Sequence, residues 1–283
     1  MTVACVGHVE WLEFVRVDHL PTAGEIVHAG EAWEEPGGGG TMAAVQLARL
    51  AGAATFFTAL GDDARGHRAH DELERLGLRV HAAWRDEPQR RAFTYLDANA
   101  ERTITVLGDR LVPTGADDLP WEELEGADTV YVTGADVTAL QRARAATVLT
   151  ATPRVGPALQ ESGVELDALI YSADDPGERS AAQALTSRSR YVVSTEGAKG
   201  GHWTAAEGRT DTFHAAPLPA EPADSYGAGD CFAAGTTFAL GEGRPIEEAV
   251  ALGAQCGAEA MTRPGGWALR PRSASGRARV PPS

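Results

Sequence analysis

The segment from Asp224 to Asp230 places two carboxylates around a turn of small residues, and an apolar, alanine-rich run then continues to Leu240. The turn reads Asp-Ser-Tyr-Gly-Ala-Gly-Asp. Glycines leave backbone N–H groups open to a ligand, and a helix beginning at about Asp230 directs the positive end of its dipole to the same place. The segment therefore predicts a turn followed by a helix, with an anion bound by the amides of Gly227, Ala228 and Gly229.

Asp230 would lie beside that anion. If the anion is a phosphate, the carboxylate is a candidate general base for an alcohol that attacks it. The simpler alternative is that Asp230 only caps the helix, because aspartate is common at that position. A cap alone does not account for the whole run of glycine, alanine and flanking aspartates, so we favour the catalytic interpretation.

Composition limits the class of protein. The chain has 283 residues, 43% of them hydrophobic, which suits one large α/β domain or a core with a small appendage. A net charge of −15 argues against nucleic acid and anionic membranes as partners, although a local group of amides can still bind ATP. Three cysteines without paired spacing indicate a reducing compartment. With no apolar stretch near 18 residues and no signal peptide, we expect a cytoplasmic protein.

Buried-type strands alternate with helical segments along the chain. Short apolar runs predict strands at 3–7, 54–61, 128–134, 166–171 and 191–195, while helices are expected at about 43–50, 64–76 and 246–261. This order predicts an α/β fold with a doubly wound, mostly parallel sheet flanked by helices. Residues 139–149 are helical or mixed, and the strand after them is poorly defined. Looser alternation at 11–35, 79–84 and 91–106 predicts a small β-sheet lid, with a hairpin turn at 98–101.

Four glycines, Gly37 to Gly40, precede a predicted helix. They let the backbone approach a ligand closely; a flexible linker is the alternative. A P-loop is excluded because no Gly-Lys-Ser/Thr follows. A dinucleotide site is disfavoured because residues 31–36 make a poor strand.

The run from Asp224 to Asp230 resembles the D-T-x-G-A-G-D hallmark of the ribokinase-like (PfkB) sugar and nucleoside kinases, with Ser225 in place of Thr. The glycines at 37, 38 and 40 are similar to part of a second signature, G-G-K-G-x-N, and residues 195–200 are similar to T-x-G-x-x-G. The resemblance covers about residues 3–266. It implies phosphoryl transfer from ATP to a hydroxyl of a sugar, nucleoside or related small alcohol, with Mg²⁺ present and a monovalent cation left open.

The resemblance also implies roles for individual residues. Asp230 becomes the catalytic base and the amides of 227–229 the anion hole. The nucleotide would lie along Thr195, Gly197, Gly200 and Asp224. The family's magnesium motif, N-x-x-E, falls on Ser172 and Asp175, so Asp175 is a candidate metal-site carboxylate, with a helix-capping role as an equal alternative.

The acceptor would contact Glu10, Gly38, Gly39, Gly40 and Met42. In ribokinase-type members an Asp and an Asn hold the sugar hydroxyls, and the corresponding positions here are Leu12 and Met42, which cannot hydrogen-bond them. An unpaired buried hydroxyl costs about 1–3 kcal/mol, so we expect D-ribose to be a poor substrate. Glu10, Glu13 and Asp136 are possible replacements. Asp63, in a turn similar to the family's G-x-D-x-x-G, is either a substrate contact or a helix cap.

These expectations give a kinase domain at 1–269, with its lid from about 11–35 and 90–107, and a basic tail at 270–283. By the resemblance, the lid mediates a homodimer. The alternative function is a catalytically weak nucleotide- or ligand-binding regulatory protein on the same fold. The altered magnesium and sugar positions favour that alternative, whereas the intact Asp230 opposes it.

Overall fold

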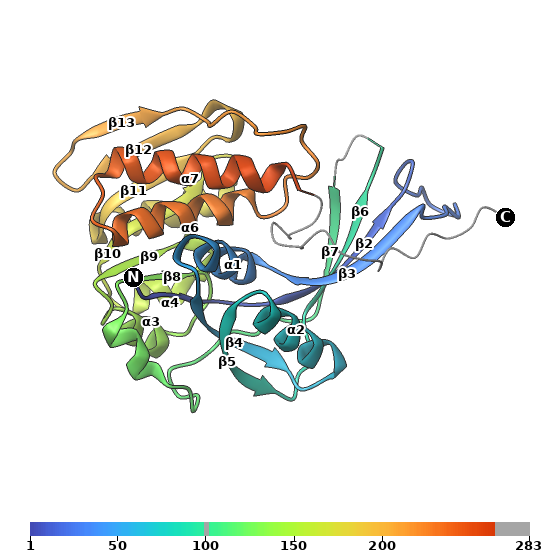
Figure 1. Ribbon diagram of the computed structural model, residues 1–283, viewed down its shortest axis with the longest axis horizontal. Helices are drawn as coiled ribbons and strands as arrows, with labels where there is room; N and C mark the ends of the chain where they lie inside the picture. The colour runs from blue at the N-terminus through green and yellow to red at the C-terminus, as the bar shows by residue number, and fades with distance from the viewer. Residues whose placement is uncertain (99–101, 264–283) are drawn as a thin grey trace.

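Across residues 1–98 and 102–263, which the computed structural model describes, strands alternate with helices and build a large nine-stranded sheet (Figure 1). Its strand order is β13-β12-β11-β10-β9-β8-β1-β4-β5. The strands are β1 (Val3–Val6), β4 (Ala54–Gly61), β5 (Leu78–Arg85), β8 (Thr129–Val132), β9 (Val148–Ala151), β10 (Leu166–Ser172), β11 (Ser189–Thr195), β12 (Gly201–Ala205) and β13 (Thr210–Phe213).

The large sheet is parallel from β5 to β11, and only β12 and β13 run antiparallel at one edge. Strand β1 pairs with β4 on one side and β8 on the other. The strand order therefore reverses at β1, and ligands of open α/β sheets bind outside the carboxyl ends of the strands at such a point.

Helices cover both faces of the large sheet. One face packs against α1 (Gly39–Ala51), α2 (Ala64–Arg75), α6 (Ala228–Gly241) and α7 (Ile246–Met261). The other packs against the 3₁₀ helix η1 (Trp121–Gly126), α3 (Val137–Ala143), α4 (Pro157–Glu161) and α5 (Pro176–Gln183). Successive residues of β1 divide between the two cores, with Val3 and Cys5 in one and Ala4 and Val6 in the other. The predicted doubly wound, mostly parallel sheet is confirmed.

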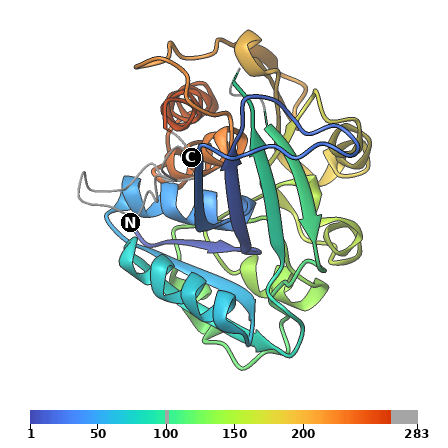
Figure 2. The same ribbon diagram turned by 90° about the vertical axis from the view of Figure 1, so that its right-hand side faces the viewer.

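A second, four-stranded sheet extends from the large one (Figures 1 and 2). This small sheet has the order β3-β2-β6-β7 and consists of β2 (Glu10–Arg16), β3 (Glu31–Gly37), β6 (Arg91–Leu96) and β7 (Arg102–Leu107). Its core is formed by Leu12, Phe14, Ala92 and Leu96, against which Trp33 and Tyr226 pack. Strand β7 is exposed along its whole length.

Two sequence expectations about strands are wrong. Residues 79–84 belong to β5, at the edge of the large sheet, and their alternating pattern arises because an edge strand is covered only in part. Residues 31–36 do form a strand, because β3 pairs antiparallel with β2 along its full length and needs little intrinsic strand preference. Helix α6 begins at Ala228, two residues before the expected start at Asp230.

Three short 3₁₀ segments complete the described elements: η2 (Pro153–Val155), η3 (Thr186–Arg188) and η4 (Gly197–Lys199). Part of the expected hairpin turn, residues 99–101, and the expected basic tail at 270–283 lie outside the described residues. Within the described chain, no helix is long and apolar enough to cross a membrane.

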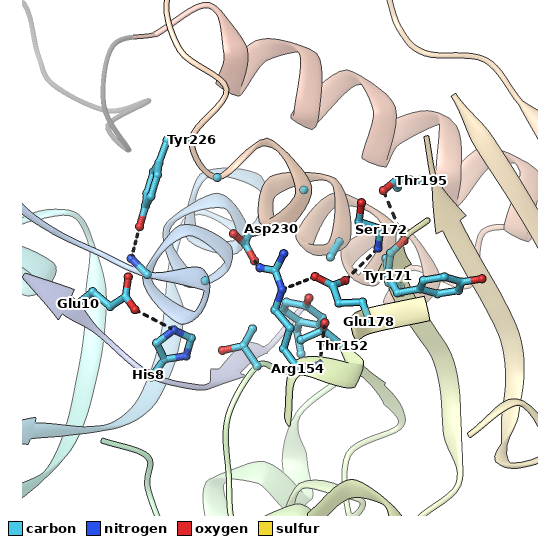
Figure 3. A pocket seen from close by; sticks show the side chains of 18 of the residues that line it. His8, Glu10, Thr152, Arg154, Tyr171, Ser172, Glu178, Thr195, Tyr226 and Asp230 are labelled. Atoms are coloured by element: carbon cyan, nitrogen blue, oxygen red, sulfur yellow. Dashed lines mark hydrogen bonds and ion pairs between the residues drawn. The ribbon is translucent and has the colours of Figure 1, made fainter. Parts of the chain in front are cut away.

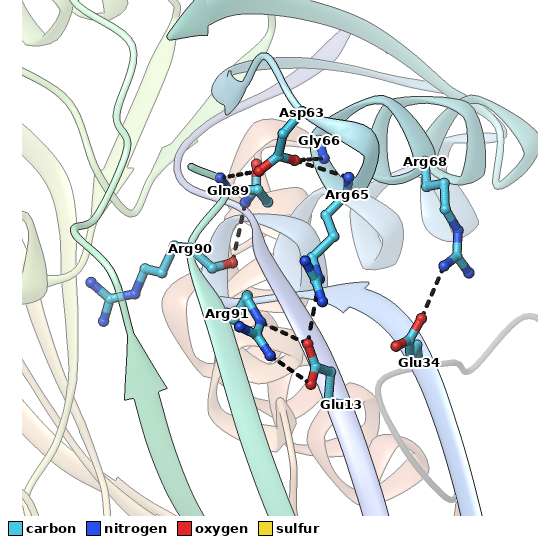
Figure 4. A network of polar contacts seen from close by, with 9 residues as sticks. All are labelled: Glu13, Glu34, Asp63, Arg65, Gly66, Arg68, Gln89, Arg90 and Arg91. Atoms are coloured by element: carbon cyan, nitrogen blue, oxygen red, sulfur yellow. Dashed lines mark hydrogen bonds and ion pairs between the residues drawn. The ribbon is translucent and has the colours of Figure 1, made fainter. Parts of the chain in front are cut away.

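Asp63 fastens the small sheet to the large one (Figure 4). Its Oδ1 caps α2 by accepting hydrogen bonds of 2.9 Å from the amides of Arg65 and Gly66. Its Oδ2 accepts a 3.0 Å bond from the amide of Gln89, just before β6. Burial raises the pKa of Asp63, but these hydrogen bonds outweigh it, so the net shift of the pKa is downward. The structure assigns Asp63 to the cap rather than to the cavity described below.

We expect Asp63→Ala to lower the free energy of unfolding by about 1–2 kcal/mol, because a helix cap is lost. The depressed pKa means that the charged form stabilises the fold above the ordinary aspartate pKa, and that this stabilisation is lost as the pH falls through the folded-state value. Urea denaturation at neutral and acidic pH would measure it. Asp62→Ala, at the exposed neighbour that pairs with His67, is the matched control; equal losses in both variants would contradict the capping role.

Candidate active site

A cavity of about 340 Å³ opens at the carboxyl ends of the central strands of the large sheet, next to the small sheet (Figure 3). Its lining combines residues after β1, β8 and β9, residues of β7, β10 and β11, and the first turn of α6. The polar side chains in this lining include His8, Glu10, Arg102, Arg110, Thr133, Thr152, Arg154, Tyr171, Ser172, Glu178, Thr195, Tyr226 and Asp230. The cavity lies where the strand order reverses, as expected for this sheet type.

The turn before α6 is held in place by Asp224. Its Oδ1 accepts a 2.8 Å hydrogen bond from the amide of Tyr226. Gly227 then takes a left-handed conformation, with φ of 73°, directly before the helix. A β-carbon on Gly227 would lie 2.3 Å from the Met42 methyl group, so glycine is also required by packing. The turn thus places Gly227, Gly229 and Asp230 on the cavity wall, where first-turn amides lack intrahelical partners.

Asp230 projects into the cavity from the first turn of α6 (Figure 3). A β-carbon on Gly39 would lie 2.8 Å from its Oδ1, so the glycine at the start of α1 leaves room for the carboxylate. Burial raises the pKa of Asp230, while the charge of Arg154 opposes this and the charge of Glu178 adds to it. A carboxylate with a raised pKa at a helix N-terminus combines proton-accepting ability with proximity to bound anions.

Arg154 connects Asp230 with Glu178 in the centre of the cavity (Figure 3). Its Nη1 lies 4.0 Å from Oδ1 of Asp230, and its Nε donates a hydrogen bond to Glu178 Oε1. Glu178 is buried in the first turn of α5, and its Oε2 accepts a 2.9 Å bond from the amide of Ser172. One cation thus lies between two carboxylates. Burial lowers the pKa of Arg154, but the charges of Asp230 and Glu178 raise it by more, so the net shift is upward.

One end of the cavity borders the small sheet. Here Glu10 Oε1 accepts a 2.8 Å bond from Arg90 Nε and lies 4.0 Å from His8 Nε2. Burial, followed by the charges of Arg110, Arg90 and Arg154, lowers the pKa of His8 to about 3, so its imidazole is neutral at physiological pH. The amide of Gly38 donates a 2.8 Å bond to the Tyr226 hydroxyl, and both residues line this part of the cavity.

The opposite end lies against β10 and β11. Thr195 donates a 3.4 Å hydrogen bond to the carbonyl of Tyr171, and Tyr171 and Ser172 line the wall beside it. Gly197 and Gly200 follow Thr195 in the turn at η4 but are not among the lining residues. A β-carbon on Gly200 would lie 2.0 Å from the carbonyl oxygen of Phe213, so packing as well as its φ of 89° requires glycine here.

The structure brings together most of the residues singled out in the sequence. Asp230, Gly227, Gly229, Glu10, Gly38, Gly39 and Thr195 line the cavity. Others support it from behind: Gly40 packs on the His8 backbone, Met42 packs beneath Gly227, and Asp224 holds the turn. Ala228 lies behind the wall as the first residue of α6.

Asp175 is not brought into the cavity. Its Oδ1 caps α5 by accepting hydrogen bonds of 2.8 and 3.1 Å from the amides of Gly177 and Glu178. The helix-capping alternative therefore describes this carboxylate, and the acid that faces the cavity is Glu178, three residues further on. Leu12 lies in the core of the small sheet, Glu13 pairs with Arg91, and Asp136 caps α3, so none of the three lines the cavity.

Sequence reasoning missed Arg154, Glu178, His8 and Arg110. Each of the first three follows a strand of the large sheet within a few residues, and that position is a usable signal in a parallel sheet. Arg154 is hard to find in the sequence because β9 has only four residues, so the strand expected after 139–149 is poorly defined. Arg110 follows β7 and reaches the cavity only through the packing of the small sheet on the large one.

Comparison with known proteins identifies relatives over nearly the whole chain. The family described as "pfkB family carbohydrate kinase" matches residues 1–160 and 162–271. An ATP-dependent ribose-1-phosphate kinase from Halopiger xanaduensis is 26% identical over 274 residues, covering 93% of each chain. A ribokinase from Bacillus subtilis is 27% identical over 272 residues, covering 88% of each. The structure of Arabidopsis thaliana ribokinase complexed with ribose and ATP matches with a TM-score of 0.74 at 20% identity, covering 93% of each chain.

Proposed function

The chain belongs to the pfkB family of carbohydrate kinases, and we propose that Asp230 is the general base for phosphoryl transfer from ATP to an acceptor hydroxyl. The acceptor class is a sugar, a nucleoside or a related small alcohol. Relatives named for ribose and for ribose 1-phosphate support a sugar-type acceptor without identifying it.

The observation that carries this proposal is the position of Asp230. Its carboxylate faces the cavity between Gly39 and Arg154, with a raised pKa, at the N-terminus of a 14-residue helix. A base in this position takes the proton of the acceptor hydroxyl as the new oxygen–phosphorus bond forms and the bond between the γ-phosphorus and the leaving ADP breaks. A protein that only binds ligands would have no need of such a group, which disfavours the regulatory alternative.

The amides of residues 227–229 are proposed to stabilise the transferring phosphoryl group. Gly227 and Gly229 present no side chain to the cavity, so an anion can approach the first turn of α6. Negative charge on the phosphoryl oxygens would be met by these amides and by the positive end of the helix dipole. A preorganised donor of this kind contributes about 3 kcal/mol to transition-state stabilisation. Arg154, beside Asp230, adds a formal positive charge at the same place.

ATP is proposed to extend from Asp230 toward Ser172 and Thr195. Magnesium, when bound with the nucleotide, would neutralise charge on its phosphates. Glu178 fits an indirect role in this, because both its oxygens already accept hydrogen bonds, from Arg154 and from the amide of Ser172. In the described part of the chain, no three acidic, histidine or cysteine side chains converge tightly enough to hold a metal ion. The ion would therefore depend on the phosphates for most of its ligands.

The small sheet is proposed to act as a lid, since it borders the cavity through Glu10, Arg102 and Ile104. Water is a competing acceptor, and covering the cavity would exclude it. The cytoplasm, where ATP is available, suits an enzyme whose three cysteines are free and buried.

We expect a homodimer formed through the small sheets. Strand β7 is an exposed edge that carries Ile104, Val106 and Leu107, each about two-fifths exposed, and such an edge can pair with a second copy. Sedimentation equilibrium would measure the association. Val106→Lys should shift the protein toward monomer, whereas a monomeric wild-type protein at micromolar concentration would reject this arrangement.

The transfer reaction is tested by incubating the purified protein with ATP and Mg²⁺ and each of a panel of sugars, sugar phosphates and nucleosides. Release of ADP that depends on one acceptor, with formation of its phosphate ester, supports the proposal. Binding of ATP without acceptor-dependent release across the panel favours the regulatory alternative.

A further inference from the structure

Four guanidinium groups line the cavity or lie beside it, although the chain carries a net charge of −15. Arg102, Arg110 and Arg154 line the cavity, and Arg90 lies just behind Glu10. Such a cluster places like charges together, which is unfavourable unless anions compensate for them. The question is which of these charges the protein itself compensates.

Three of the four have an acidic partner. Arg90 pairs with Glu10 at 2.8 Å and Arg154 pairs with Glu178. Arg102 lies 4.0 Å from Asp224 Oδ1 and over the ring of Tyr226. Arg110 differs: within residues 1–98 and 102–263 no carboxylate lies within 4.0 Å of its guanidinium, which donates a 3.0 Å bond to the Arg154 carbonyl. Arg110 is an exposed residue; partial burial and then the charge of Arg90 lower its pKa, while the charge of Glu10 opposes this.

The same wall holds two buried polar atoms that have no hydrogen-bond partner in the described part of the chain. They are Nδ1 of His8 and Oγ1 of Thr133, on side chains that are 5% and 2% exposed. Both residues line the cavity. Both atoms are closed to solvent, with Thr133 Oγ1 on the side of Gly7 and His8 Nδ1 on the side of Gly134, so the feature at this end that calls for a ligand is Arg110.

We propose that the acceptor is an anionic sugar derivative, such as a sugar phosphate or a sugar acid, whose charged group is bound by Arg110 while its hydroxyl faces Asp230. This rests on the proposed kinase function. A guanidinium forms paired, charge-assisted hydrogen bonds with phosphate and carboxylate oxygens. His8 and Thr133 line the same part of the cavity and would be neighbours of the sugar. Arg110 is assigned to the acceptor end because it follows β7 of the small sheet and donates to the Arg154 carbonyl, whereas Ser172 and Thr195, proposed to lie along ATP, belong to β10 and β11.

Equilibrium titration and steady-state kinetics with matched compounds test this assignment. The panel pairs D-ribose with ribose 1-phosphate and ribose 5-phosphate, D-fructose with fructose 6-phosphate, and D-glucose with gluconate, and includes the neutral nucleoside adenosine. We expect one anionic compound to exceed its neutral parent by about 10- to 100-fold in kcat/KM and in binding without ATP. The phosphate and carboxylate members of the panel show which anion is preferred.

Arg110→Met should remove that preference by raising the acceptor KM, with the KM for ATP little changed. Arg110→Lys should restore part of it. Arg188→Met is the matched control, because that exposed arginine also donates to a carbonyl, of Gln160, outside the cavity. A rise in the KM for ATP in place of the acceptor KM would overturn the assignment of Arg110.

The kinase function and the anion site at Arg110 can be rejected separately. Turnover confined to neutral sugars or nucleosides would reject the anion site and keep the kinase. A binding preference for anionic sugars that Arg110→Met abolishes, without turnover of any acceptor, would reject the transfer reaction and keep the anion site.

Discussion

Replacing Asp230 with Asn should lower kcat by about 100- to 10,000-fold, because the amide cannot take the proton of the acceptor hydroxyl. The change is nearly isosteric, so the contact with Gly39 and the fold of the turn should persist. ATP affinity should stay close to that of the wild type, since the proposed phosphate contacts come from amides and Arg154.

Asp175→Asn is the matched control for this prediction. It makes the same chemical change at another helix N-terminus, but the side chain caps α5 outside the cavity. Steady-state kinetics and nucleotide titration on both variants are sufficient. Equal, small losses in kcat for the two variants would remove Asp230 from the role of base.

The raised pKa of Asp230 gives this role a pH signature. The base must be ionised, so kcat/KM should fall as the pH decreases through this raised pKa. The acidic limb of the profile should be absent from the residual activity of Asp230→Asn.

Arg154→Met is expected to give the second large effect, a loss in kcat of about 100-fold or more. The Arg154 guanidinium lies between the carboxylates of Asp230 and Glu178 (Figure 3). Its positive charge lowers the pKa of Asp230 against the effect of burial. Without it, the pKa of Asp230 rises further, so the acidic limb of the pH profile should move to higher pH.

The shift of the pH profile separates this electrostatic role from a general loss of structure. Arg154→Lys keeps the charge and should restore part of kcat with a smaller shift. Arg179→Met is the control, because this exposed arginine on α5 donates a 3.1 Å hydrogen bond to the Ala173 carbonyl and is not among the residues that line the cavity. An unchanged acidic limb in Arg154→Met would contradict coupling between Arg154 and Asp230.

The sequence was most informative where local chemistry determines local structure. The glycines around Ala228 predict a turn before a helix, and short apolar runs predict parallel strands, because both signals depend on neighbouring residues. The large sheet, helix α7 and the position of Asp230 at the start of α6 follow from them. The resemblance to the motifs of the PfkB kinases added the expected phosphoryl-transfer chemistry.

Features set by tertiary packing were harder to predict. The alternation of residues 79–84 is the same for an edge strand of the large sheet as for the small one, and only pairing with β4 decides between them. Asp175 directly precedes α5 and Glu178 lies in its first turn. The sequence does not say which of the two carboxylates caps the helix and which faces the cavity. Arg154 and Arg110 enter the site because β9 and β7 bring them there from distant parts of the chain.

The most direct test of the central claim is single-turnover transfer of a labelled γ-phosphoryl group from ATP to the best acceptor, in the wild type and in Asp230→Asn. Nucleotide occupancy would be fixed by prior titration of each protein. We expect rapid labelling of the acceptor by the wild type and slow labelling by fully ATP-loaded Asp230→Asn. Equal labelling rates in both proteins would contradict the assignment of Asp230 as the base.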